Sequence, residues 1–269
     1  MKHFLAISLA LIALSCTSSN NDNIKAIKVN YPLLDDYFES YSFKYNDLGQ
    51  VTEVEQYSFY DSDKRRSTWK YDYNSCILSA KAEFTSWGMT HSGNATFTGD
   101  LAHITKMEID PDTEENPQTG ICFLGQSWDC TYEDGHLVKC SFYDYTSDGM
   151  DVDILKWNDN GDICGYEGSD PSVTVEYKNI EYLDTLNPFK GLDPLAYLLD
   201  INEFYWHGLA GKRPSRLIKG FTRSACDNDW ETKKTDYITF EYQTDSKGRI
   251  SQISRLFNGE ADKTLEIEY

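Results

Sequence analysis

Residues 238–253 read ITFEYQTDSKGRISQI, and this stretch decides the fold. Ile238, Phe240 and Tyr242 alternate with polar residues, which is the period of a strand with one buried face and one wet face. Residues 245–248 (DSKG) follow; Asp favours the opening of a type I turn, and Gly takes the left-handed conformation that closes it. Alternation then resumes. The stretch therefore predicts an antiparallel β-hairpin.

Similar stretches recur at loosely regular intervals, so the sequence predicts a repeat of hairpins. In each, an alternating aromatic strand leads into a polar turn that ends in Gly, and a second alternating strand follows. We therefore predict a mainly β fold: a strongly curved antiparallel sheet or partial barrel of repeated hairpins, wrapping one α-helix. The clearest further copies cover residues 41–59, 128–138 and 154–164, with weaker copies near 69–84 and 97–107.

One segment departs from this pattern and predicts a helix near 194–206. Asp193 suits the N-cap and Pro194 the first helical position. Apolar residues from Leu195 onward fall near helical spacing over a wide arc, so we expect the helix to be buried on the concave face of the sheet. Gly208 is typical of the residue that ends such a helix.

The end of this predicted helix holds the candidate ligand-binding residues Tyr205, Trp206 and His207. Aromatic side chains stack on sugars and apolar groups and would form a ligand wall; core packing is the simpler interpretation. Aromatic residues elsewhere are candidates for an exposed binding face on the strands, with cross-strand packing as the alternative. These are Tyr57, Tyr60, Trp69, Tyr71, Trp87 and Trp128.

The beginning of the chain is typical of a targeting segment rather than of a fold. Phe4 to Leu14 is an uncharged apolar run, too short to cross a bilayer as a helix but of signal-peptide length. Residues 13–16, Ala-Leu-Ser-Cys, resemble a bacterial lipobox, in which the thiol of Cys16 carries the lipid. An ordinary cleaved signal peptide with an incidental Cys is the alternative.

These features divide the chain into a lipoprotein signal peptide (1–15), a flexible polar tether (16–24) and a single β domain (25–269). No Asp follows Cys16 directly, which by resemblance to Gram-negative lipoproteins indicates sorting to the outer membrane. We expect a palmitate-bearing lipoprotein of the cell envelope, anchored on the periplasmic face or at the cell surface. The membrane is then its first partner, through the lipid anchor.

The overall charge excludes one class of partner. The chain of 269 residues has 25 Lys plus Arg against 44 Asp plus Glu, a formal net charge of −19. Phosphates are bound by dense Lys and Arg, so we expect no nucleic-acid partner. An aromatic content of 14% and a hydrophobic content of 40% favour a folded domain over disorder.

Six cysteines remain once Cys16 is assigned to lipid, and an exported chain permits disulfides between them. Their spacings do not fit a zinc site. A tight turn at residues 134–135, pairing Glu133 with His136, would place Cys130 opposite Lys139 and Cys140 opposite Asp129. We therefore expect these two thiols not to face each other directly. For the six cysteines as a set, we expect a mixture of buried free thiols and one or two bridges.

Catalytic and cofactor motifs are missing from the sequence. There is no nucleophile elbow, zinc-protease helix, Walker loop or dinucleotide-binding glycine motif. Residues 144–155 match only half of an EF-hand loop, because Thr146 and Leu155 stand where calcium ligands belong. We therefore predict no catalytic residue, no metal and no cofactor, and we favour a function other than catalysis.

Two hairpin sequences carry a family resemblance. Residues 45–51 (YNDLGQV) and 242–250 (YQTDSKGRI), with the lipobox and the break at 187–189 (NPF), resemble an uncharacterised family of Bacteroidetes lipoproteins, described as a domain of unknown function with a porin-like fold. The hairpins are also similar to the YD repeats of bacterial wall and toxin-shell proteins. The resemblance covers roughly residues 25–269 and implies a curved antiparallel sheet or partial barrel without transferable catalytic residues.

We therefore predict a non-enzymatic binding or scaffolding lipoprotein whose curved sheet accepts a glycan, peptide or apolar ligand. One alternative is a glycan hydrolase that uses paired carboxylates, motivated by acidity and location. Another is an outer-membrane β-barrel, because the strands alternate and the chain ends in Leu265-x-Ile267-x-Tyr269. The lipobox and the charges beside aromatics on the predicted strands argue against that barrel.

Overall fold

The computed structural model describes most of the chain from residue 23 onward. The predicted signal peptide, Cys16 and nearly all of the predicted tether lie outside the described residues. The described ranges are 23–34, 37–60, 63–74, 77–86, 89–100, 103–109, 126–144, 150–170, 172–189, 192–201, 209, 211–227 and 233–269.

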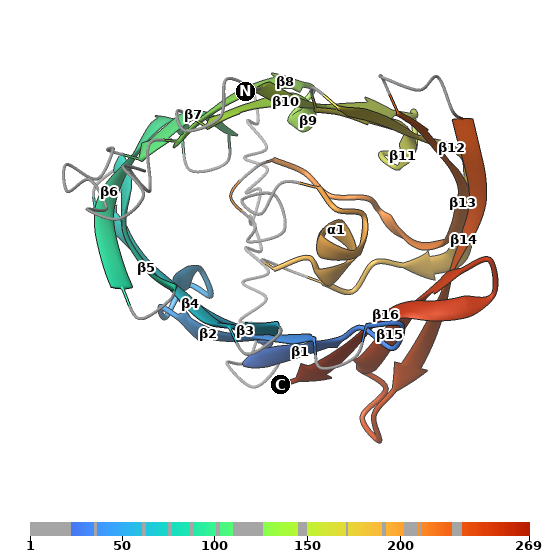
Figure 1. Ribbon diagram of the computed structural model, residues 1–269, viewed down its shortest axis with the longest axis horizontal. Coiled ribbons are helices and arrows are strands. Elements are labelled where there is room, and N and C mark those ends of the chain that lie inside the picture. Colours follow the sequence, from blue (N-terminus) through green and yellow to red (C-terminus); the bar gives the residue numbers. More distant parts are fainter. Residues whose placement is uncertain are drawn as a thin grey trace, which may run out of the picture.

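The described residues form sixteen antiparallel strands that close into a barrel (Figure 1). Each strand pairs with its neighbours in the chain, and the first pairs with the last. The strands are β1 (Ala26–Asn30), β2 (Phe38–Tyr45), β3 (Val51–Tyr60), β4 (Asp63–Asn74), β5 (Ile77–Ser86), β6 (Met89–Asp100), β7 (His103–Ile109), β8 (Gln126–Glu133), β9 (His136–Asp144), β10 (Met150–Trp157), β11 (Ile163–Ser169), β12 (Val173–Leu186), β13 (Arg216–Asp227), β14 (Lys233–Thr244), β15 (Ile250–Phe257) and β16 (Glu260–Glu268).

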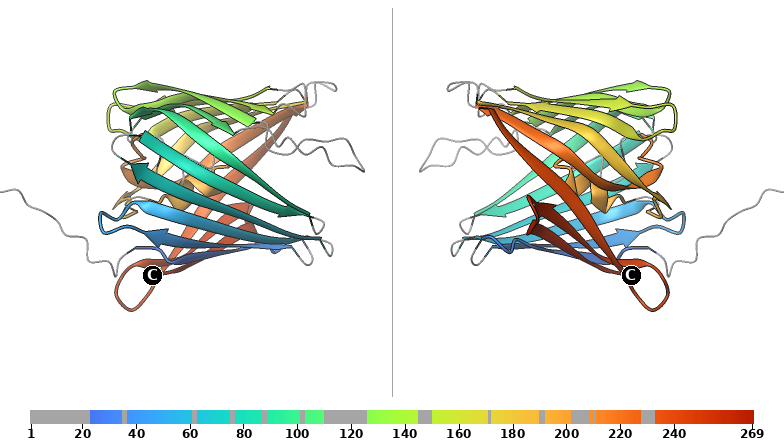
Figure 2. Two further views of the ribbon diagram at one scale, coloured as in Figure 1. Left: turned by 90° about the vertical axis from the view of Figure 1, so that its left-hand side faces the viewer. Right: turned by 90° about the vertical axis from the view of Figure 1, so that its right-hand side faces the viewer.

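The prediction of a mainly antiparallel β fold is confirmed, but the expectation of an open curved sheet or partial barrel is wrong. β1 pairs with β16, with Ile27 opposite Ile267 and Val29 opposite Leu265, so the wall has no free edge. All four residues are buried. Hairpin repeats predict that strands pair locally; closure depends on total twist and tilt, which no single hairpin encodes. Figure 2 shows this tilt from two sides.

The local turn chemistry agrees with the sequence. At the β14–β15 turn, the Asp245 carboxylate accepts hydrogen bonds from the backbone N–H of Lys247 at 2.8 Å and of Arg249 at 3.0 Å. Gly248 has a φ of +77°, in the left-handed region that favours glycine. The same combination of an Asx side chain and a left-handed Gly closes the β2–β3 turn, where Asn46 precedes Gly49.

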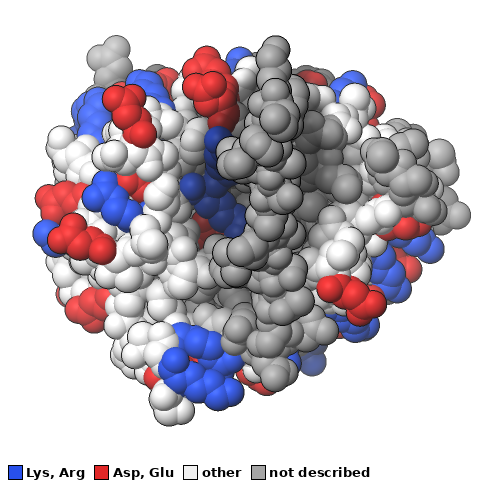
Figure 3. All heavy atoms as spheres, turned by 180° about the vertical axis from the view of Figure 1, so that it is seen from behind, with Lys and Arg blue, Asp and Glu red and all other residues white. Residues whose placement is uncertain are grey.

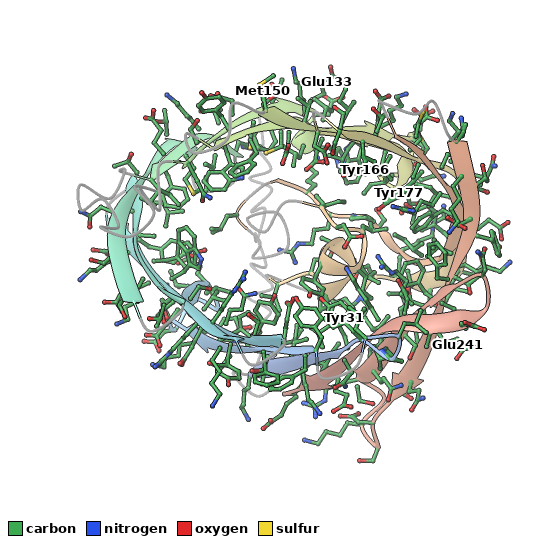
Figure 4. The ribbon with its side chains drawn as sticks, viewed as in Figure 1. Tyr31, Glu133, Met150, Tyr166, Tyr177 and Glu241 are labelled. Atoms are coloured by element: carbon green, nitrogen blue, oxygen red, sulfur yellow. The ribbon has the colours of Figure 1, made fainter. Side chains whose placement is uncertain are left out.

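Alternate residues of each strand line the inside and the outside of the barrel. Tyr31, Tyr166 and Tyr177 point inward, whereas Glu133 and Glu241 point outward (Figure 4). The buried residues form one continuous hydrophobic core on the inner side. Acidic and basic side chains are scattered together over the face seen in Figure 3.

A segment between β12 and β13 folds back into the barrel, and we call it the plug: residues 187–189, 192–201, 209 and 211–215. It contains α1 (Pro194–Leu198), whose N-cap Asp193 accepts a hydrogen bond from the N–H of Leu195 at 3.0 Å. Its return arm is fixed at the rim, where the Lys212 N–H donates to the carbonyl of Gly135 at 2.8 Å.

The start of the predicted helix is confirmed and its length is wrong. α1 ends at Leu198, and Asp200 has a left-handed φ of +56°, which no α-helix contains. Residues 202–206 lie outside the described residues. The apolar spacing correctly predicted that this segment is buried. It could not predict the length of the helix, because a segment enclosed by a barrel wall is apolar on all sides whether or not it is helical. No helix in the described part of the chain is long and apolar enough to cross a bilayer.

Candidate functional site

A pocket of about 260 Å³ lies between the plug and the inner wall formed by β10–β13. Its wall carries Asp151 and Asp153 from β10, Tyr166 from β11, and Arg223 from β13. The plug contributes Asp200. The pocket lies toward the β11–β12 turn, at the end of the barrel opposite to the first residue of β1. We call that opposite end the far end, and the end with Ala26 the near end.

Two stacked tyrosines form the apolar side of the pocket. The rings of Tyr166 and Tyr177 lie 4.6 Å apart between centroids, at an interplanar angle of 30°, and Phe221 continues the stack at 4.4 Å from Tyr177. The Tyr166 hydroxyl donates to Asp153 at 2.7 Å, and the Tyr177 hydroxyl donates to the carbonyl of Leu199 at 3.2 Å. These bonds fix both rings against the wall.

The two phenols stay neutral under ordinary conditions. Burial raises the pKa of Tyr166, and the negative charge of Asp153 raises it further. Burial likewise raises the pKa of Tyr177, with a contribution from Asp200. The rings therefore offer a neutral aromatic surface, and their hydroxyl protons are already donated to Asp153 and to the carbonyl of Leu199.

Carboxylates outnumber cations around the pocket. Asp151, Asp153, Asp170 and Asp200 line it, against Arg223 alone. Arg223 is itself directed toward a buried carboxylate, with Nη1 at 3.8 Å from Oδ2 of Asp236. The lining therefore has an acidic excess, and a positively charged or hydrogen-bond-donating ligand is complementary to it.

Asp170 is held in its ionised form at the rim. It accepts hydrogen bonds from the N–H and hydroxyl of Ser172 at 2.6 and 2.7 Å and from the N–H of Val173 at 2.7 Å. The hydrogen bond from the Ser172 side chain lowers the pKa of Asp170. This turn at the mouth is thus preorganised by its own side chain.

Asp200 belongs to an ion network that fastens the plug to the wall. Arg255 of β15 reaches Asp200 at 2.9 Å, and Lys263 of β16 reaches it at 2.5 Å. Arg255 also pairs with Asp262 and donates to the carbonyl of Leu198 at 2.9 Å. Although desolvation opposes ionisation, Lys263 and Arg255 hold the pKa of Asp200 below its usual value.

A second anchor of the plug is a cluster of tyrosines around Glu39, a carboxylate on the inner face of β2. The Tyr197 hydroxyl of α1 donates to Glu39 Oε2 at 2.8 Å, and the Tyr31 hydroxyl donates to Oε1 at 3.1 Å. Tyr37 and Tyr41 donate to the same carboxylate. With its hydrogen-bond sites occupied, Glu39 is a structural group rather than a reactive one.

A wider groove of about 870 Å³ lies at the near end, over the turns that follow β8 and β10. His136 lies against Trp157, with ring centroids 4.2 Å apart, and the Trp157 indole donates to the carbonyl of Leu137 at 2.8 Å. Burial, then the charge of Lys212, lowers the pKa of His136. Lys139 and Lys156 line the groove with three carboxylates, Glu133, Asp134 and Asp159, so its acidic excess is smaller than that of the interior pocket.

The predicted ligand residues Tyr205, Trp206 and His207 lie outside the described residues. Of the predicted exposed aromatics, Trp69, Tyr71 and Trp128 are instead buried in the barrel core, with Trp69 only 2% exposed. Alternation identifies residues that share a face, but it does not say which face becomes the inside.

Tyr57 does lie outside, against Phe38 at 5.9 Å between ring centroids. Trp87 and the side chain of Tyr60 lie outside the described residues. The sequence reasoning missed Tyr166, Tyr177 and Arg223. Alternation could have grouped the two tyrosines only if the β11–β12 register had been known.

No family model matches the chain, and no curated protein matches it in sequence. Among the solved structures that are similar to it in fold, two are described as porin-like proteins. One is from Bacteroides vulgatus, with a TM-score of 0.60 and 12% identity over 91% of this chain and 98% of that chain. The other is from Bacteroides uniformis, with a TM-score of 0.52 and 13% identity over 91% of this chain and 96% of that chain. At such identities the likeness shows the fold: a closed antiparallel barrel of the porin-like type.

Proposed function

We propose that this protein is a lipid-anchored barrel of the cell envelope that stands in water and binds a small, positively charged ligand in its interior pocket, without catalysing a reaction. The observation that carries the proposal is the pocket itself. In this pocket, stacked tyrosine rings lie beside an excess of carboxylates. The plug, which is bonded to the barrel wall, forms one side of it.

The polarity of the wall supports attachment by lipid rather than by the barrel. A barrel that crosses a membrane presents an outward apolar band to the lipid. Here the outward positions of β3 and β4 carry Glu53, Glu55, Arg66 and Lys70, which line a charged surface depression. Val54 of β3 and Trp69 and Tyr71 of β4 face inward and are buried.

The direction of the chain supports an outward-facing pocket. β1 begins at Ala26, so a tether ending at residue 24 joins the barrel at the near end. If Cys16 carries the lipid, the near end faces the membrane. The pocket, toward the far end with Asp170 at its rim, then opens away from the membrane to solutes.

The pocket chemistry narrows the ligand. An ammonium or guanidinium group is attracted both by the carboxylates and by the negative faces of aromatic rings. Both an amino sugar and a peptide with a basic side chain carry such a cation. The proposal therefore concerns the cationic group that these two kinds of ligand share. A purely apolar ligand would displace water from the carboxylates of Asp151 and Asp153 and offer them no hydrogen bond in return, which is costly.

The pKa directions of Asp170 and Asp200 argue against either side chain as the general acid of a glycan hydrolase. A hydrolase of the two-carboxylate type needs one carboxyl with a raised pKa to act as general acid. The pKa values of Asp170 and Asp200 are instead lowered. Both side chains are therefore ionised and act as acceptors.

Thermal unfolding of the full-length chain in detergent, with matched ligand sets, tests the binding proposal. We expect amine-bearing saccharides and basic peptides to raise the unfolding midpoint more than their neutral counterparts, and acidic counterparts not to raise it. Asp151→Asn should weaken binding by at least about fivefold. The matched control is Asp129→Asn, the same change on an exposed residue outside the pocket. Equal binding of amine-bearing and acidic ligands would contradict the proposal.

Anchoring is tested separately in cells. Labelled palmitate should be incorporated into the wild-type chain and not into Cys16→Ser, which should be released from the membrane fraction by a wash. Retention of Cys16→Ser in the membrane under high salt would instead support a barrel that inserts by itself.

A further inference from the structure

We propose that Cys130 and Cys140 form a disulfide bond across the β8–β9 hairpin, inside the barrel. The two residues are direct partners in the register, and their Sγ atoms lie 3.4 Å apart. The inference stands independently of the proposed ligand.

The pairing results from a β-bulge that local turn chemistry does not predict. The hairpin begins with Glu133 opposite His136, as a two-residue turn requires, but the register then shifts between Thr131 and Tyr132. Thr131 lies opposite Lys139, so Val138 is the extra residue. This shift overturns the expectation that the two thiols do not face each other.

The backbone spacing suits the bond. Cα atoms of directly opposed residues in antiparallel strands lie about 4.5–5.5 Å apart, and disulfides span about 4.4–6.8 Å. Both side chains point to the inner face, where Cys140 is 2% exposed and Cys130 is half-buried. The bond therefore requires closer approach of two side chains that already touch, not a movement of strands.

The other described cysteines have different surroundings. Cys164 of β11 is exposed, and Cys226 of β13 lies opposite Thr174 of β12 and Lys233 of β14. Among the cysteines in the described ranges, only Cys130 and Cys140 are register partners. Cys164 therefore serves as the matched control for substitution of a thiol by a hydroxyl.

The chemistry is a thiol–disulfide exchange with an external disulfide as oxidant. The hydrogen bond between the two thiols lowers the pKa of Cys130. The same hydrogen bond and burial raise the pKa of Cys140. Cys130 therefore ionises first and attacks the donor, releasing one thiolate and forming a mixed disulfide. Cys140 then attacks Sγ of Cys130 and displaces the second thiolate. Two electrons pass to the donor, which is reduced to two thiols, and the two protons of the cysteines are transferred with them.

Trypsin mapping tests the bond on the full-length chain in detergent. Lys139 lies between the two cysteines, so trypsin separates them into the peptides 107–139 and 140–156. After incubation with oxidised glutathione and blocking of remaining thiols, we expect these two peptides to be joined. Separate, blocked peptides from the oxidised chain would overturn the proposal.

Cys122 also lies in peptide 107–139, so variants assign the partner. The joined peptide should persist in Cys122→Ser and disappear in Cys130→Ser. Persistence in Cys130→Ser would assign the bond to Cys122 and overturn the inference.

Thermal unfolding gives a readout independent of peptide recovery. A disulfide restricts the unfolded chain, so oxidation should raise the unfolding midpoint of the wild-type protein by about 5–10 °C. Cys164→Ser should keep this difference between oxidised and reduced protein, and Cys140→Ser should lose it. Equal midpoints for oxidised and reduced wild-type protein would count against the bond, as would an undiminished difference in Cys140→Ser.

Discussion

The inner and outer faces of the barrel wall are built from alternate residues of the same strands, yet they differ in composition and in how their charges are held. On β14, Ile238 and Phe240 face the core, whereas Tyr237 and Glu241 are exposed. Charges on the inner face are networked, as in the pairing of Arg255 with two aspartates. Charges on the outer face form exposed pairs such as Lys44 with Glu53.

A porin-like fold therefore does not by itself fix a membrane environment. The topology of a closed barrel satisfies the backbone hydrogen bonds in water and in lipid alike. The environment is decided by which alternate set of side chains points outward. Here the apolar set points inward and packs against the plug, so the free energy of folding should depend mainly on the inner face.

The largest predicted effect separates the two faces by truncation of one aromatic ring on each. Phe221 is 1% exposed and packs between Tyr177 and Phe240. Phe221→Ala should lower the free energy of unfolding by about 3–5 kcal/mol. Tyr237→Ala, at a residue 46% exposed, should lower it by less than about 1 kcal/mol. Denaturant unfolding followed by tryptophan fluorescence measures both; equal losses would remove the distinction between the faces.

The second prediction concerns the inner ion network. Arg255→Met preserves much of the side-chain volume but leaves Asp200 and Asp262 without their shared guanidinium. We expect a loss of about 2–4 kcal/mol, because the partly buried Asp262 carboxylate loses its guanidinium partner, whereas Asp200 keeps Lys263. Release of the plug should accompany the loss and is measurable as faster hydrogen exchange at Leu198 and Leu199. Wild-type exchange at both residues in the variant would show that the network does not hold the plug.

The third prediction uses alkaline pH on an inner tyrosine. Burial raises the pKa of Tyr73 from 10.0 to about 12. Because the folded state holds this proton more tightly than the unfolded state, the stabilisation is complete below pH 10 and is lost as pH rises from 10 to about 12.

The measurement is the unfolding midpoint as a function of pH, compared between wild type and Tyr73→Phe. The variant loses the hydroxyl that donates to the carbonyl of Val51 at 2.7 Å, so it should be less stable at neutral pH. It should also decline less between pH 10 and 12. Parallel curves for the two proteins over this range would indicate that Tyr73 does not contribute to alkaline unfolding.

The smallest predicted effect is on the outer face. Lys44→Met removes a 2.7 Å ion pair on the outer face between an exposed lysine and a half-buried Glu53. Water and salt screen such pairs, so the unfolding midpoint should not change measurably. A loss comparable to that of Arg255→Met would mean that the outer charges stabilise the barrel as much as the inner ones do.

Some features of the fold could be predicted from the sequence and others could not. The hairpin turn at Gly248 was predictable because Asp245 and a left-handed Gly act within four residues. The pairing of Cys130 with Cys140 was not, because one extra residue at Val138 shifts the register without any signal in composition. The burial of Trp69 was missed because alternation fixes a shared face but not its direction.

The candidate site was less accessible to prediction than the fold. Tyr166, Tyr177 and Arg223 belong to three different strands and meet only through strand pairing, while Asp200 arrives from the plug. No spacing in the sequence links them. The start of the helix was predictable, because the N-cap Asp193 acts on residues next to it. Its end was not, because the residues after Leu198 are apolar where the barrel wall encloses them and not because they continue the helix.

The sequence by itself determined the alternating strands, their turns and the acidic character of the chain, because these depend on neighbouring residues and on composition. Only the tertiary structure decided that β1 meets β16, that the plug folds inward, and that carboxylates gather beside a tyrosine stack. Those outcomes depend on twist and register accumulated over sixteen strands. A single bulge changes the register, so contacts distant in the chain are set by the closed wall as a whole.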